Sequence, residues 1–364
     1  MNNELLMELA GQFQLDGVLS SVKPLGEGFI NDTFIVKTEG EETPNYILQR
    51  KNKNIFTDVP AMMENILKVT THLKKKVLEQ GGDPSREAMT IVPTKAGDNC
   101  FVDADGEFWA VCEFISDTIA YQNAETPELA YAGGKGIGKF QNMLSDMKEP
   151  LVDILPGFHN IKVRYEQWDA VIAKDPVGRV KEVQKEIEWI ESRREKMMEF
   201  WTLVENGTIP SRVTHNDTKI NNILFDQEGE VLCVIDLDTV LNSPVLNDYG
   251  DALRSYTNTG LEDDENLDNV SMDWSIFKAY TEGYLSETKA FLTPSELEWL
   301  AFGGLYITYE QVLRFLMDYI DGDNYYKTKS EHHNLVRTRA QYALLESMEG
   351  QYDKMRDFVL SLAK

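Results

Sequence analysis

The residues best suited to chemistry lie in the middle of the chain, around Asp217. Residues 213–225 read VTHNDTKINNILF, and the pattern His-x-Asp-x-Lys-x-x-Asn falls on His215, Asp217, Lys219 and Asn222. A hairpin sequence follows, and Asp236 then closes an apolar run. Phosphoryl transfer needs one carboxylate to orient and deprotonate the attacking hydroxyl, and an amide with a second carboxylate to hold Mg²⁺. These residues therefore predict phosphoryl transfer.

Each of these residues also has an ordinary structural interpretation. A polar THND segment is typical of a helix cap, and an aspartate after an apolar strand is typical of a turn. The joint occurrence of the ordered set on both sides of one hairpin favours the functional interpretation. In that interpretation His215 organises the loop from behind.

The elements around this set change in character along the chain. The first third predicts short strands at residues 22–25, 33–36, 46–49, 101–102 and 108–114, with one amphipathic helix over residues 59–77. From about Pro127 the periodicity predicts helices over residues 129–147, 163–173, 180–204, 275–285, 294–320 and 333–362. We therefore predict an α+β protein with a β-sheet N-lobe at residues 1–115 and a larger helical C-lobe at residues 116–364.

Composition narrows the possible partners. The 364 residues include 36 basic and 61 acidic side chains, for a formal net charge of −25. Such a charge repels nucleic-acid phosphates and anionic lipid, so we expect no nucleic acid and no membrane among the partners, and no protein partner is implied. The three cysteines lack metal-ligand spacing, and no secretory signal is visible in MNNELLMELAGQF, so a cytoplasmic location is expected.

Several blocks of the chain resemble one known family. GEGFINDTFIV, YILQR, THNDTKINNILFD, VIDLDT and NDYGDALR are similar to the aminoglycoside phosphotransferase and choline kinase superfamily, and within it to the branch of N-acetylhexosamine 1-kinases. The resemblance implies a bilobal protein-kinase-like fold, ATP as co-substrate and Mg²⁺ as cofactor. It also implies these roles: Asp217 as catalytic base, Lys219 as catalytic-loop lysine, Asn222 and Asp236 as Mg²⁺ ligands, Asp238 as a weaker auxiliary contact, and Asp248 and Asp251 as supports behind the site.

The nucleotide end contains one departure from the kinase pattern. Gly26 and Gly28 lie between two predicted strands, which favours a phosphate-covering loop over a dinucleotide site, although a plain hairpin turn has the same pattern. In the next strand, Gln49 occupies the position where a phosphate-binding lysine is expected. Gln49 and Lys51 share one face of this strand, and Gln49 can offer only a neutral hydrogen bond. Mg²⁺ would then carry more of the phosphate charge.

The remaining site residues follow from the resemblance. Adenine is expected to bind the backbone of the connector at Glu113 and Ile115. The acceptor sugar is assigned to Arg314 and Tyr325, with Asn31 and the base Asp217. A buried Arg314 would oppose a cationic acceptor such as choline but can donate to a sugar or acetamido oxygen.

The expected function is ATP-dependent phosphorylation of an N-acetylhexosamine, GlcNAc or GalNAc, to its α-1-phosphate. Two alternatives remain open at the level of sequence. One is a kinase for another small alcohol, such as choline, homoserine or an aminoglycoside. The other is a nucleotide-binding pseudokinase, which Gln49 favours and the intact catalytic set opposes.

Overall fold

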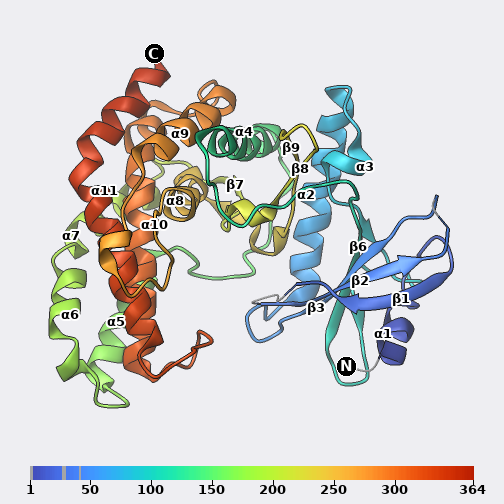
Figure 1. Cartoon of the computed structure of the whole chain (residues 1–364), viewed down its shortest axis with the longest axis horizontal. Helices are drawn as coiled ribbons and strands as arrows, with labels where there is room; N and C mark the ends of the chain where they lie inside the picture. Colours follow the sequence, from blue (N-terminus) through green and yellow to red (C-terminus); the bar gives the residue numbers. More distant parts are fainter. Residues whose placement is uncertain (1–2, 27–29, 41) are drawn as a thin grey trace. The chain divides into compact units, whose positions relative to one another are not determined.

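The computed structural model describes residues 3–26, 30–40 and 42–364. The chain divides into two compact units (Figure 1). The first contains Met1–Ile119, Asp146–Leu155 and Leu224–Leu241, and the second contains Ala120–Ser145, Pro156–Ile223 and Asn242–Lys364. Two later segments thus return to the N-terminal unit, and the second of them contains Asp236.

The first unit is built on an antiparallel sheet in the order β1-β2-β3-β6-β4, with β5 paired to β6. Its strands are β1 (Leu19–Pro24), β2 (Asp32–Thr38), β3 (Tyr46–Lys51), β4 (Ile91–Val92), β5 (Phe101–Val102) and β6 (Phe108–Glu113). One face is covered by α1 (Asn3–Ala10), where Leu6 and Leu9 join Val36, Leu48 and Trp109 in the core. The sheet confirms the predicted N-terminal β-rich part, whereas α1 and β4 were not predicted because they are too short to show periodicity.

Helix α2 (Val59–Glu79) confirms the predicted amphipathic helix. Asp58 caps its start by accepting a hydrogen bond from the Ala61 backbone N–H, and Pro60 occupies the first turn, where no N–H partner is needed. Asn65 on α2 binds the segment that returns at residues 146–155: its Nδ2 donates to the Val152 carbonyl at 2.8 Å, and its Oδ1 accepts from the Val152 N–H at 2.9 Å. Beyond α2 the unit contains the short α3 (Pro84–Glu87).

The predicted hairpin before Asp236 is confirmed. β8 (Ile223–Phe225) pairs with β9 (Val231–Val234), and Asp226 closes the turn by accepting from the N–H groups of Glu228 and Glu230. Gly229 has a φ of 86°, which glycine adopts without steric cost. Asp236 follows two residues after the end of β9.

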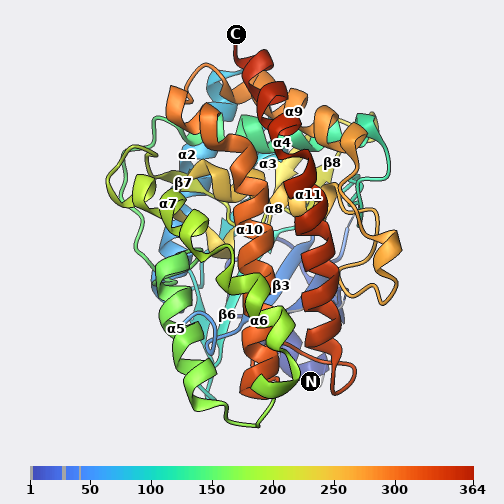
Figure 2. The same cartoon turned by 90° about the vertical axis from the view of Figure 1, so that its left-hand side faces the viewer.

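The second unit is mainly helical. Its helices are α4 (Pro127–Leu144), α5 (Ile161–Lys174), α6 (Gln184–Glu191), α7 (Arg194–Glu205), α8 (Val245–Tyr256), α9 (Trp274–Thr288), α10 (Pro294–Asp321) and α11 (His333–Ala363), with the strands β7 (Arg212–Thr214) and β10 (Leu241–Ser243). Helix α4 packs along α9, and α10 packs against both α8 and α11; Figure 2 shows α10 and α11 side by side. The fold is therefore α+β, as predicted.

One predicted helix is wrong. Residues 180–204 do not form a single helix. A short 3₁₀ turn at Val180–Glu182 precedes α6, and the helix is interrupted between α6 and α7. At the break, Arg193 donates to the Trp189 carbonyl of α6 and binds both carboxylate oxygens of Glu349 on α11. This bidentate pair comes from a residue 156 positions away, so the local apolar periodicity could not reveal it.

The long apolar segment at the start of α10 raises the question of membrane insertion. Buried Glu310 and Asp318 interrupt it. Among the helices that the structure describes, none is both long and apolar enough to cross a membrane.

Two glycines, Gly250 and Gly303, allow the backbones of α8 and α10 to approach closely where the helices cross. A methyl group at Gly250 would lie 2.1 Å from the carbonyl oxygen of Gly303, and one at Gly303 would lie 2.4 Å from the carbonyl oxygen of Leu246. Real Cβ atoms do not approach carbonyl oxygens so closely, so the two backbones touch only because both side chains are absent. The position of α8, and of the carboxylates Asp248 and Asp251 on it, depends on this contact.

We predict that Gly250→Ala destabilises the protein by about 1–3 kcal/mol, because overpacking forces two backbones apart. Thermal unfolding of the purified variant measures this loss. The matched control is Gly350→Ala on α11, where a methyl group meets nothing within 4 Å and helix propensity favours alanine by up to about 1 kcal/mol. An unchanged melting temperature for Gly250→Ala would contradict the close-contact argument.

Candidate active site

Asp217 lies in the loop that joins β7 to a 3₁₀ turn at Ile220–Asn222. Lys219 Nζ lies 2.9 Å from its Oδ1, and Asn222 Nδ2 donates to its Oδ2 at 3.1 Å and to its backbone carbonyl at 2.8 Å. The Asp217 side chain is 28% exposed and that of Lys219 is 42% exposed. The structure thus brings together three of the predicted site residues, with the carboxylate accessible from outside.

The charges around Asp217 keep it ionised. Burial opposes ionisation, but the positive charge and hydrogen bond of Lys219, together with His215 and Arg254, hold the pKa of the Asp217 carboxyl below its ordinary value. In return, Asp217 raises the pKa of the Lys219 ammonium. The pair is therefore a carboxylate and an ammonium at neutral pH.

Two carboxylates of α8 hold the backbone of this loop. Asp248 accepts from the N–H of His215 at 2.9 Å and from the N–H of Asn216 at 2.6 Å, and Asp251 accepts from the N–H of Thr218 at 2.9 Å. Burial raises the pKa of Asp248, which these two N–H groups partly counteract. The carboxylates of α8 thus fix the main chain of the loop at His215, Asn216 and Thr218.

His215 and Asn216 shape the loop directly before Asp217. His215 Nδ1 accepts from the Asp217 N–H at 3.2 Å, and the His215 ring packs edge-on against Phe140 at a centroid distance of 6.0 Å. Asn216 has a φ of 66°, in the left-handed region that asparagine tolerates better than most residues. His215 thus does what we expected of a loop organiser.

Asp236 lies in the first unit, at the end of β9, with φ and ψ of 60° and 54°. The left-handed backbone turns the chain sharply there, and aspartate is among the few residue types that accept it. Asn222 lies in the second unit, and its amide nitrogen is used by Asp217; among the described residues, no donor occupies its Oδ1. Both predicted metal ligands thus present oxygen atoms, the donor type that Mg²⁺ prefers.

The structure reveals a buried polar cluster around Asp238. Lys51 Nζ lies 2.7 Å and 2.9 Å from the two Asp238 oxygens, and Asn31 Nδ2 donates to Oδ2 at 2.7 Å. Lys51 is only 3% exposed and also donates to Gln49 Oε1 at 2.7 Å. Asp238 therefore has a lysine as its partner, and Gln49 is accompanied by a cation on the same strand face.

Sequence reasoning missed Lys51. The kinase pattern places a lysine at the position of Gln49, whereas strand alternation puts Lys51 on the same face two residues later. The sequence did not show that Lys51 pairs with Asp238, because the two residues are 187 positions apart in the chain.

The other nucleotide-binding predictions fall on two parts of the first unit. Gly26, two residues after the end of β1, has a φ of 69°, and Gly28 lies outside the described residues. At the end of β6 the Glu113 N–H donates to the Thr90 carbonyl at 2.9 Å, so only the Glu113 carbonyl is left for a ligand. Among the described residues, nothing accepts the N–H of Ile115.

Arg314 and Tyr325 lie together in the second unit. Arg314 Nη2 lies 3.5 Å from the Tyr325 hydroxyl, and the guanidinium carbon lies 5.6 Å and 5.5 Å from the ring centroids of Tyr325 and Tyr326. Tyr325 is 60% exposed. Asp318 shapes the loop that carries it, because its carboxylate accepts from the N–H groups of residues 324, 325 and 326.

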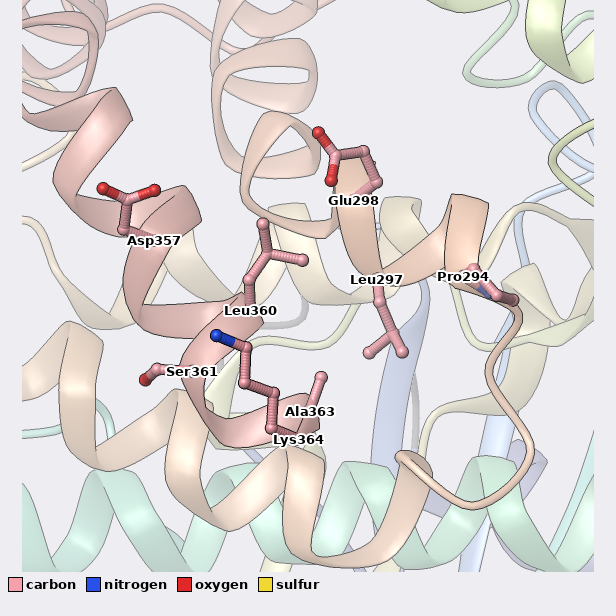
Figure 3. Close-up of a pocket in the computed structure, with 8 residues that line it drawn as sticks. All are labelled: Pro294, Leu297, Glu298, Asp357, Leu360, Ser361, Ala363 and Lys364. Atoms are coloured by element: carbon pink, nitrogen blue, oxygen red, sulfur yellow. The ribbon is translucent and has the colours of Figure 1, made fainter.

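One cavity of about 610 Å³ lies between the start of α10 and the end of α11 (Figure 3). It is lined by Pro294, Leu297, Glu298, Asp357, Leu360, Ser361, Ala363 and Lys364. Arg314 lies 16 residues further along α10 than Glu298, which corresponds to roughly 24 Å of helix. The cavity is therefore separate from the predicted acceptor residues.

Comparison with known proteins identifies a family and several similar folds. Residues 21–276 match the family described as the phosphotransferase enzyme family. Similar folds occur in an aminoglycoside phosphotransferase from Alicyclobacillus acidocaldarius (14% identity, TM-score 0.61, covering 97% of this chain and 96% of that one) and a microcompartment-associated aminopropanol kinase (15%, 0.64, 97% and 98%). A choline kinase from Cryptosporidium parvum is also similar (14%, 0.54, 99% and 99%). At these identities the structures establish the fold, which is the protein-kinase-like fold predicted.

We predict that Lys219→Gln raises the pKa of the Asp217 carboxyl, because the nearest positive charge that favours the carboxylate is removed. As the pH falls, Asp217 then takes up its proton at a higher pH than in the wild-type protein. Carboxyl-carbon NMR titration measures the shift. Lys162→Gln, which removes an exposed pair with Glu205, is the control and leaves this titration unchanged; an equal titration in Lys219→Gln would refute the pairing.

Proposed function

Because this chain belongs to the phosphotransferase enzyme family, we propose that it transfers the γ-phosphate of ATP to the anomeric hydroxyl of an N-acetylhexosamine. The observation that carries the phosphoryl-transfer part is the Asp217 carboxylate, kept ionised by Lys219 and fixed by the backbone of its loop. The acceptor class rests on the charges around Arg314.

The proposed reaction is a single displacement. The sugar hydroxyl gives its proton to Asp217, and its oxygen forms a bond to the γ-phosphorus. The bond from that phosphorus to the β,γ-bridging oxygen breaks, and ADP leaves with the electron pair. Lys219, 2.9 Å from Asp217, carries positive charge at the place where the transferred group arrives. The product is the hexosamine α-1-phosphate.

Nucleotide binding is assigned to the first unit. Gly26 and Gly28 cover the phosphates, Gln49 offers a neutral donor, and the connector at Glu113 and Ile115 receives adenine through the carbonyl and the N–H described above. Asn222 and Asp236 would hold Mg²⁺, which when bound neutralises charge on the phosphates. Their oxygen donors suit that ion.

The charges near Arg314 favour a neutral acceptor over a cationic one. The two carboxylates of α10 that flank Arg314 are both used: Glu310 binds His159 and Arg164, and Asp318 accepts three backbone N–H groups and the Asn334 amide. An aminoglycoside site needs free negative charge for its ammonium groups, and a choline site uses aromatic faces, which here already lie against the Arg314 cation. A guanidinium beside two tyrosine rings suits the oxygens and the flat face of an acetamido sugar.

Asn31 remains a proposed sugar contact, although both polar atoms of its side chain already have hydrogen-bond partners. Its Nδ2 donates to Asp238, and its Oδ1 accepts from the Asn52 N–H at 3.0 Å. A sugar hydroxyl would have to share or replace one of these partners. We therefore rank Arg314 and Tyr325 first among the acceptor residues.

We predict that Asp217→Asn lowers turnover by about 10²–10⁴-fold, the usual contribution of a general base. The affinity for ATP changes little, because the proposed role of Asp217 is toward the hydroxyl. Steady-state kinetics and calorimetric nucleotide binding measure the two effects. Asp169→Asn, which removes an exposed carboxylate paired with Arg194, is the control; near wild-type turnover in Asp217→Asn would exclude the assignment.

The acceptor is tested by incubating the protein with MgATP and GlcNAc, GalNAc, glucosamine, glucose, choline, ethanolamine or an aminoglycoside. We expect phosphorus NMR to show an anomeric phosphate with the acetamido sugars. A phosphorylated amino alcohol or aminoglycoside would replace the sugar proposal with that alternative. Nucleotide binding without turnover of any acceptor would favour the pseudokinase.

A further inference from the structure

The peptide bond between Asn216 and Asp217 is held from both sides by histidines. Its N–H donates to His215 Nδ1 at 3.2 Å, and its carbonyl oxygen lies 3.4 Å from His159 Nε2. His215 belongs to the loop itself. His159 lies in the segment before α5, 57 residues earlier in the chain, and no motif of the sequence pointed to it.

The other side of the His159 ring is bound to a buried carboxylate. Nδ1 lies 2.6 Å from Glu310 Oε2, and Arg164 Nε donates to Oε1 at 2.9 Å. Glu310 is 1% exposed, and burial opposes its ionisation, but His159 and Arg164 hold its pKa far below its ordinary value. Glu310 is therefore an ionised acceptor.

The two contacts together define what the ring has to donate. A carboxylate and a main-chain carbonyl are both acceptors, so a hydrogen bond at both places requires an N–H at each ring nitrogen of His159. The charged groups that face the ring are Glu310 of α10 and, across that carboxylate, Arg164 of α5 and Arg314 of α10. The surroundings thus place an ionised carboxylate directly against the ring.

The position of His159 is itself tightly constrained. Its backbone φ of 53° lies in the left-handed region, which is uncommon for non-glycine residues, although histidine adopts it more often than most. Its carbonyl accepts from the Tyr306 hydroxyl at 2.7 Å, and the ring lies against Phe158 at a centroid distance of 4.1 Å. Strained residues of this kind persist where the surrounding structure holds them, often at functional sites.

We propose that His159, anchored by Glu310, is a positioning residue that fixes the peptide plane carrying the catalytic base Asp217. The inference rests on the proposed role of Asp217. Rotation of this peptide would swing the Asp217 side chain, and small misplacements of a reacting group cost large factors in rate. Glu310 also lies one helical turn before Arg314, so the base and the proposed acceptor contact share one anchor in α10.

The test compares two substitutions, each of which keeps a hydrogen-bond donor at the position of one of the two ring nitrogens of His159. The amide nitrogen of glutamine reaches the place of Nε2, so His159→Gln keeps a donor for the Asn216 carbonyl. The amide nitrogen of asparagine reaches the place of Nδ1, so His159→Asn keeps the donor for Glu310 and loses the carbonyl contact. Backbone preference acts in the opposite direction, because asparagine accepts positive φ more readily than glutamine.

We expect His159→Asn to lower kcat about tenfold or more, with KM for ATP unchanged, and His159→Gln to stay within about threefold of the wild-type protein. A purely structural role would favour asparagine. The matched controls are His72→Gln and His72→Asn, which alter a histidine paired with Asp146 in the first unit and should leave kcat unchanged.

Nitrogen NMR of the wild-type protein supplies a readout that needs no variant. A proton on His159 Nε2 supports the proposal, because that nitrogen faces the Asn216 carbonyl, and its absence overturns the proposal. Equal kcat in the two His159 variants, or a higher kcat in the asparagine variant, also overturns it. If the His159 results contradict the proposal while Asp217→Asn is inactive, only the positioning role of His159 is wrong. If Asp217→Asn retains turnover, both the base assignment and the positioning role are wrong.

Discussion

The hydrogen bonds from the backbone of the Asp217 loop to two carboxylates of α8 are the constraint on which the second unit depends. Asp248 and Asp251 lie nearly one helical turn apart, so together they receive three N–H groups of the loop. Buried carboxylates are costly unless such donors surround them. The donors are in reach because Gly250 lets α8 approach α10 to backbone contact. Loop geometry, helix packing and the ionisation of Asp217 are thus parts of one arrangement.

The acidic composition gives electrostatics a particular weight in this protein. A chain with a net charge of −25 must attract a polyanionic nucleotide, yet the cations close to the proposed site already have carboxylate partners. Lys219 pairs with Asp217, Lys51 with Asp238 and Arg254 with Asp251. Phosphate would have to compete with these partners or bring its own counter-charge. A divalent metal supplied with the nucleotide meets that requirement, so metal dependence is a central expectation for the proposed reaction.

Prediction from sequence succeeded where the causes are local. The amphipathic pattern predicted α2 and α10, and the polar turn at Gly229 predicted the hairpin of β8 and β9. It failed where a distant partner decides. The break between α6 and α7 is stabilised by a bidentate pair between Arg193 and a residue of α11, which leaves no trace in the periodicity of the segment.

The sequence by itself determined which donors, acceptors and charges the Asp217 loop carries, because the order His, Asp, Lys, Asn places them within eight residues. Only the tertiary structure decided which residues those groups pair with. Lys51 acquires a partner 187 residues away, and His159 reaches the peptide of Asp217 from 57 residues earlier. The partner of neither residue leaves a local signal, since a buried charge is defined by what folds against it. Types and spacing are encoded locally, whereas burial and pairing exist only after the chain has folded.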